Sequence, residues 1–159
     1  MANYTPTEVR TKLSGPVFPI PTPFNEDGNV NTKALKNYTK FLVDCGAKTI
    51  MTTVGTSRFN LLSNDEIFQV NEIVCSSVPS QVITIAAGPI TGSLQSNIQF
   101  AQQAEAVGFD SYIACYPERW YGNEAVFNFF EKLSESVSIG IMIHEQAMKN
   151  GYGGQIQYP

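Results

Sequence analysis

Short apolar runs alternate with segments of helical periodicity along most of this chain. The runs are rich in β-branched residues and predict five strands, at 17–20, 49–54, 82–87, 111–115 and 139–143. Between them, apolar positions spaced three or four residues apart predict four helices, at 32–45, from 64 onward, at 93–107 and at 123–136. Such regular alternation is typical of parallel strands joined by right-handed crossovers.

The predicted helices have clear apolar stripes and clear ends. The helix at 32–45 is built on Ala34, Leu35, Tyr38, Phe41, Leu42 and Cys45, and the helix at 123–136 on Val126, Phe127, Phe130 and Leu133. A capping box, in which Ser63 accepts from the backbone of Glu66 and Glu66 reaches back, opens the second helix. Gly46 and Gly108 are good stop signals for the helices that precede them.

Two α/β architectures fit this order: an open doubly wound sheet and part of a (β/α)8 barrel. A dinucleotide-binding sheet would carry Gly-x-Gly-x-x-Gly after its first strand. Residues 19–24 occupy that position and read Pro-Ile-Pro-Thr-Pro-Phe, without a glycine. There is no Walker loop either, so the pattern favours the barrel.

Composition narrows the classes of function. The chain is 43% hydrophobic with a formal net charge of −4. Its lysines and arginines form no basic stripe, so we expect no nucleic-acid partner. No apolar run approaches the ~20 residues that cross a bilayer, and no secretory signal is evident, so we expect a cytoplasmic protein without membrane contact. Three separated cysteines, Cys45, Cys75 and Cys115, and a single histidine predict buried free thiols, with no disulfide framework and no metal site.

Four motifs in order carry a resemblance to a known family. They are residues 18–28 (strand into Thr-Pro-Phe and an Asp-Gly turn), 55–57 with 62–66 (Gly-Thr-Ser and Leu-Ser-Asn-Asp-Glu), 86–88 (Ala-Ala-Gly) and 104–111. From about Gly15 to about Met148 the chain resembles the dihydrodipicolinate synthase / N-acetylneuraminate lyase family. The resemblance implies a (β/α)8 TIM barrel and class I aldolase chemistry, in which a lysine forms a Schiff base with pyruvate or a related 2-keto acid and no cofactor is required.

The resemblance also implies a site after the second strand. The family's hydroxyl pair, which holds the keto acid's carboxylate and relays protons, corresponds to Thr56 and Ser57. The same two hydroxyls would also suit an ordinary turn that caps the strand. Arg58 and Phe59 stand where the family has Gly-Glu, so Arg58 either pairs with a substrate carboxylate or is a solvated loop residue.

Two further candidates follow later strands. Tyr116, after the fourth strand, best matches the family's site tyrosine, and its alternative role is packing. His144 stands at the end of the fifth strand, where the family usually has a tyrosine. An imidazole there could shuttle protons near neutral pH, or be a hydrogen-bonded structural histidine. We therefore predict catalytic roles for His144 and Tyr116 and substrate binding by Thr56, Ser57 and Arg58.

The family's Schiff-base lysine lies at the end of a sixth strand, which this sequence does not predict. We expect residues 1–159 to form a single domain with five strands and four helices of an incomplete barrel, an N-terminal arm at 1–14 and a glycine-rich loop at 145–159. One hypothesis is a lyase fragment that is inactive alone and joins a C-terminal half or a second copy. The other is a non-catalytic homologue that binds carboxylates or has a structural role.

Overall fold

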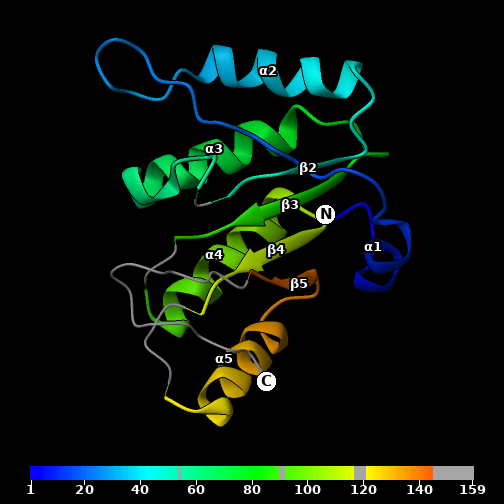
Figure 1. The fold of residues 1–159 in the computed structure, drawn as a ribbon, viewed down its shortest axis with the longest axis vertical. Helices are drawn as coiled ribbons and strands as arrows, with labels where there is room; N and C mark the ends of the chain where they lie inside the picture. Colours follow the sequence, from blue (N-terminus) through cyan, green and yellow to red (C-terminus); the bar gives the residue numbers. More distant parts are fainter. Residues whose placement is uncertain (54, 90–91, 117–120, 145–159) are drawn as a thin grey trace.

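A single parallel sheet organises the protein. The computed structural model describes residues 1–53, 55–89, 92–116 and 121–144 (Figure 1). The strands are β1 (Phe18–Pro19), β2 (Thr49–Met51), β3 (Ile83–Ala87), β4 (Ser111–Ala114) and β5 (Gly140–Ile143). Each pairs in parallel with its neighbour in sequence, in the order β1-β2-β3-β4-β5. The predicted parallel strands are confirmed.

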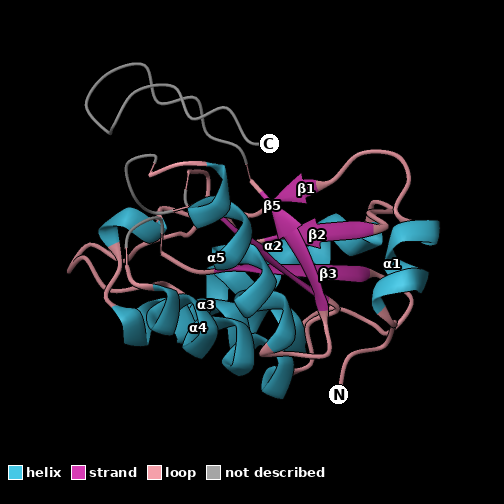
Figure 2. Cartoon of the chain, turned by 90° about the horizontal axis from the view of Figure 1, so that it is seen from below, coloured by secondary structure: helices cyan, strands magenta, loops and turns pink. Residues whose placement is uncertain are grey.

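Helices follow the strands in the same order. They are α2 (Thr32–Asp44), α3 (Asn64–Ser76), α4 (Leu94–Val107) and α5 (Asn123–Glu135), with a short 3-10 turn η1 (Phe59–Leu61) before α3. Helices α2 to α5 lie side by side along the sheet, each against the next (Figure 1). An additional helix, α1 (Pro6–Lys12), lies within the segment predicted only as an arm, and Figure 2 shows β2 and β3 between it and the other helices.

The predicted helix signals operate in the structure. The Ser63 hydroxyl accepts from the Glu66 N–H at 3.3 Å, and the Glu66 carboxylate accepts from the Ser63 N–H at 2.8 Å. The backbone and side-chain hydrogen bonds from Ser63 lower the pKa of Glu66 below its usual value. Gly108 ends α4 at a φ of 110°, a conformation that glycine adopts without steric cost.

Most apolar stripes face the core, but the two outer helices depart from the prediction. Val126, Phe130 and Leu133 of α5 are buried, whereas Phe127 is 60% exposed. On α2, Phe41 is 57% exposed and stacks against Tyr38, with ring centroids 6.3 Å apart. These helices have a neighbour on one flank only among the described elements, so the apolar residues on the other flank face solvent. Cys45 is also exposed and Cys75 is half-buried, so the expectation of three buried thiols holds fully only for Cys115.

The other face of the sheet is covered at its N-terminal end by α1. Val9 is 4% exposed and packs against Ile83 and Ile85 of β3. The preceding residues are fastened by the buried Asp110, whose Oδ1 accepts the N–H groups of Asn3 at 2.8 Å and Tyr4 at 3.0 Å. Its Oδ2 accepts the N–H and hydroxyl of Thr84, so the first residues are tied to β3 and β4.

Gly88 follows β3 and makes room for a buried tyrosine. A Cβ placed on Gly88 would overlap the hydroxyl oxygen of Tyr112 and lie 3.1 Å from its Cζ and 3.2 Å from the Phe100 Cβ. The Tyr112 hydroxyl donates to the Asn97 Oδ1 at 3.3 Å, and burial raises the pKa of Tyr112. The motif at 86–88 therefore has a steric reason for its glycine.

Candidate functional site

Hydrogen bonds hold the loop that follows β2 on two sides, to α3 and the end of β3 on one side and to the end of β1 on the other. At its start, the Thr52 hydroxyl accepts from the Ala87 N–H at 3.0 Å and donates to the Asn71 Oδ1 at 2.9 Å. The Asn71 amide in turn donates to the Ala87 carbonyl at 3.3 Å. All three residues are buried, so this network fixes the C-terminal ends of β2 and β3 relative to α3.

Ser57 fastens the same loop to the end of β1. It is fully buried, and its hydroxyl donates to the Ile20 carbonyl at 2.6 Å and accepts from the Thr53 N–H at 2.7 Å. The Thr22 hydroxyl donates to the Ser57 carbonyl. Because a serine hydroxyl has one proton, the Ile20 carbonyl uses the proton that a substrate carboxylate would need. In this structure, Ser57 positions the loop.

Thr56 and Arg58 stand on the exposed side of the loop. The Thr56 N–H donates to the Thr53 hydroxyl at 3.1 Å, and the Arg58 N–H to the Gly55 carbonyl at 3.1 Å. Arg58 has a φ of 61° and is the only non-glycine residue with positive φ in the described part of the chain. Arg58 thus adopts a left-handed conformation natural to glycine, at a cost of about 1–2 kcal/mol.

His144 continues β5 by one residue, and its N–H donates to the Ala114 carbonyl at 2.9 Å. Alternate residues of a strand share a face, so His144 lies on the same face as Met142. Met142 packs with Ile83 and Ile85 on the face covered by α1, which corresponds to the inside of a barrel. His144 is half-buried there, at the C-terminal edge of the sheet. Glu145, its sequence neighbour, lies outside the described residues.

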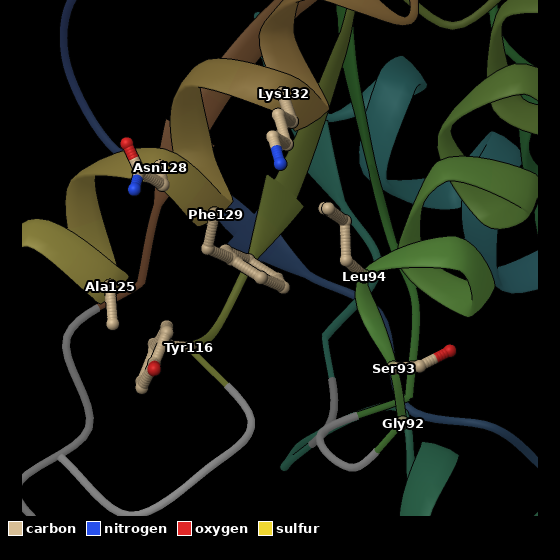
Figure 3. A pocket seen from close by; sticks show the side chains of 8 residues that line it. All are labelled: Gly92, Ser93, Leu94, Tyr116, Ala125, Asn128, Phe129 and Lys132. Carbon is tan, nitrogen blue, oxygen red and sulfur yellow. The ribbon is translucent and has the colours of Figure 1, made fainter. Parts of the chain in front are cut away.

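Tyr116 lies on the other face. Its ring meets Phe129 of α5 edge-on at 5.4 Å, and both line a cavity of about 230 Å³ between the start of α4 and α5 (Figure 3). Lys132 also lines this cavity, and in Figure 3 its side chain extends from α5 toward Leu94. The structure thus brings Thr56, Ser57 and Arg58 together on one loop and places Tyr116 on the side of the sheet opposite to the face of His144.

Sequence reasoning missed three residues that shape this site: Thr22, Thr53 and Asn71. Thr22 belongs to the Thr-Pro-Phe motif, and that motif was the available signal for its bond to the second loop. Thr53 is buried and receives the Thr56 N–H, as a strand-end threonine can. Asn71 has only a weak signal, a polar residue on the buried face of a helix.

Other chemistry at this edge is limited. In the described ranges, no group of three or more histidine, cysteine or acidic residues is arranged to hold a metal ion. Cys115 is buried after β4, and burial raises the pKa of its thiol to about 11. The lysines of the described residues lie on α1, α2 and α5 or, for Lys48, just before β2, and none of them is part of a strand end. Lys132 of α5 lines the cavity beside Tyr116. Within the same ranges, no helix is both long and apolar enough to cross a membrane.

Comparison with known proteins identifies the family that this chain matches. The Dihydrodipicolinate synthetase family matches residues 12–145. The 4-hydroxy-tetrahydrodipicolinate synthase of Chloroherpeton thalassium is 29% identical over an aligned length of 145 residues, and the match covers 89% of this chain and 47% of that protein. The chain therefore spans about half the length of the curated relatives that it matches.

Solved structures agree. A dihydrodipicolinate synthase structure is 27% identical with a TM-score of 0.75, covering 82% of this chain and 45% of the other. The N-acetylneuraminate lyase of Mycoplasma synoviae is 25% identical with a TM-score of 0.70, covering 80% and 45%. The α/β fold of five parallel strands and five helices in the described residues matches the N-terminal part of these TIM barrels. The chain belongs to the dihydrodipicolinate synthetase family.

Proposed function

We propose that the loop after β2 binds the carboxylate of a small 2-keto acid of the pyruvate type, as part of a class I aldolase site. The observation that carries this proposal is the loop itself. Ser57 and Thr22 fasten it to β1, and it presents Thr56 and Arg58 at the C-terminal edge of the sheet. In barrels of this type, ligands bind at that edge.

Arg58 is the principal anion contact in this proposal. Its guanidinium can donate two parallel hydrogen bonds to one carboxylate, which a hydroxyl cannot do. The strained φ of 61° supports a functional reason for the arginine, because glycine would hold the same backbone without strain. Thr56 adds a hydroxyl donor beside it, and Ser57 keeps both in place through the Ile20 carbonyl.

The covalent step needs a lysine that the described strand ends do not supply. A neutral lysine amine would attack the keto carbon to form a carbinolamine. Loss of water and uptake of one proton would leave a protonated imine that withdraws electrons from the adjacent carbon. The described lysines lie on helices or before β2. We therefore propose that the lysine comes from a strand after β5 and that this chain alone forms no imine.

His144 is our proposed proton carrier, because it lies on the inner face at the end of β5. Tyr116 packs edge-on against Phe129, on the face of the sheet opposite to that of His144. A catalytic role for Tyr116 therefore has less support from the geometry than one for His144.

Titration of the full chain with pyruvate, followed by calorimetry, tests the binding site. A charge-assisted hydrogen bond contributes about 1.5–3 kcal/mol, so Arg58→Gln should weaken binding by roughly 10- to 100-fold. Thr56→Val should weaken it less. Arg10→Gln and Thr7→Val, at exposed positions of α1, are the matched controls. Equal affinity of Arg58→Gln and the wild-type chain would refute this assignment.

A second candidate function is carboxylate binding without catalysis. The observation in its favour is that the described lysines lie on helices or before β2. Borohydride reduction in the presence of pyruvate separates the two. Both functions predict no covalent adduct on this chain alone. An adduct after addition of the missing part of a family barrel would support the lyase. Binding of pyruvate without any adduct, even in such a complex, would support the non-catalytic homologue.

A further inference from the structure

The cavity between the start of α4 and α5 lies outside the proposed keto-acid site. It has a volume of about 230 Å³, and its lining includes Leu94 of α4, Tyr116 after β4, and Ala125, Phe129 and Lys132 of α5 (Figure 3). The two helices pack against each other. The shape of the cavity is therefore set by α4, α5 and the end of β4, all of which lie within the described residues.

Aromatic rings form one wall of this cavity, and packing holds them in place. Phe129 is 7% exposed; its ring meets Phe130 edge-on at 5.1 Å and Tyr116 edge-on at 5.4 Å. The half-buried Leu94 lines the side formed by α4. Aromatic rings prefer edge-to-face or offset contacts with other rings. This wall therefore favours a flat aromatic ligand over a branched aliphatic one.

Lys132 gives the cavity a positive charge. It is the only charged residue among those that line the cavity in the described part of the chain, and it forms no ion pair with any described residue. In Figure 3 its side chain extends from α5 toward Leu94. The hydroxyl oxygen of Ser93 accepts the Ser96 N–H at 3.2 Å to cap α4, and the Asn128 amide turns away from Lys132 in the same view. An anionic group is thus the polar partner that this cavity selects.

The volume sets the size of the ligand. An apolar cavity of about 150 Å³ is enough to bind benzene. The volume of about 230 Å³ therefore holds one aromatic ring with a small charged substituent, and it is too small for a drug-sized molecule.

We propose that this cavity binds a small aromatic monocarboxylate of about the size of benzoate. The ring of the ligand lies between Leu94 and Phe129, beside Tyr116, and its carboxylate pairs with the Lys132 ammonium. The cavity is on the helix-covered side of the sheet, opposite to the face of His144. This second site therefore goes beyond the proposed function and does not depend on keto-acid chemistry.

Titration of the full 159-residue chain, labelled with ¹⁵N, with sodium benzoate tests the site by two-dimensional NMR. We expect saturable shifts of the amide signals of Leu94, Phe129 and Lys132. Benzamide has the ring without the charge, and acetate has the charge without the ring, so both should bind more weakly than benzoate.

Two variants separate the charge from the ring contact. Lys132→Gln should weaken benzoate binding about 2- to 5-fold, as expected for a solvated ion pair, and leave benzamide binding unchanged. Lys36→Gln, at an exposed position of α2, is the matched control and should change neither. Phe129→Leu keeps an apolar side chain and removes the ring, so it should weaken benzoate and benzamide binding alike, about 2- to 10-fold. Circular dichroism checks that each variant is folded.

Three results would overturn the proposal. The first is the absence of saturable shifts up to the solubility limit of sodium benzoate. The second is equal affinity of Lys132→Gln and the wild-type chain for benzoate. The third is a set of shifts confined to the loop after β2, which would place benzoate at the proposed keto-acid site. Pyruvate is titrated in a separate sample, so the failure of one site is distinguishable from the failure of the other.

Discussion

The contact between Gly88 and Tyr112 gives a prediction whose size follows from the structure. Alanine at position 88 places a methyl group where the Tyr112 hydroxyl lies, 3.1 Å from the Cζ and 3.2 Å from the Phe100 Cβ. Tyr112 is fully buried, so its ring has no free space to enter. The ring must shift and lose its hydrogen bond to Asn97, worth about 1 kcal/mol. Overpacking adds about 1–3 kcal/mol, so Gly88→Ala should cost about 2–4 kcal/mol.

A double-mutant cycle separates the steric cause from other effects of the substitution. Tyr112→Phe removes the clashing oxygen and costs about 1–2 kcal/mol by itself, because the Asn97 amide oxygen loses its donor. The double variant should therefore cost at least about 1 kcal/mol less than the sum of the two single variants. Urea unfolding followed by circular dichroism measures all three.

Gly55→Ala is the matched control, because a Cβ there meets nothing within 4 Å. It should change stability by less than about 0.5 kcal/mol. The steric argument would be refuted if Gly88→Ala cost no more than Gly55→Ala. Strict additivity of Gly88→Ala and Tyr112→Phe would refute it as well, since independent sites add.

Two further predictions concern other buried groups. Asp110→Ala should lower the free energy of unfolding by about 2–4 kcal/mol, because the buried Thr84 N–H loses its acceptor, and should speed hydrogen exchange in α1; the exposed Asp44→Ala should do neither. Burial raises the pKa of Cys75 and Cys115 to about 11, and at pH 8 roughly one such thiol in a thousand is ionised. Iodoacetamide should therefore modify the exposed Cys45 first, as peptide mass spectrometry would show. Equal rates of modification of the three cysteines in the folded chain would contradict this burial. As a control, all three cysteines should react in the urea-unfolded chain.

Periodicity and caps were sufficient to predict most of the fold. The four helices after β1 begin within one residue of the prediction, and the three whose ends were predicted, α2, α4 and α5, end within one residue of it. Ser63, Ser93 and Gly108 set these limits through local roles as caps. The missed helix, α1, has the same signal, since Thr5 and Glu8 form a capping box with Pro6 in the first turn. Its seven residues are too few for a periodic stripe, and its burial comes from contact with β3.

The site was less accessible to sequence reasoning. The position of the loop after β2 could be predicted from the strand pattern and the family motif. The acceptor of the Ser57 hydroxyl could not be predicted, because it is the carbonyl of Ile20, 37 residues earlier in the chain. Likewise, Tyr116 and His144 each follow a strand, and only the register of those strands assigns them to opposite faces. The exposed Phe127 fits its helical stripe and departs from it only because no described helix covers that flank.

The Asp110 anchor has a consequence for the order of folding during synthesis. Its bonds to Asn3 and Tyr4 join residues 107 and 106 positions apart. At a translation rate of about 5–20 residues per second, the first residues are synthesised roughly 5–20 s before their acceptor. Among the described strands, the sheet joins only those that are consecutive in the chain, so each unit can add to the previous one as it emerges. We therefore expect α1 to dock late, after β3 and β4 have paired, and to lock an arc that has already formed.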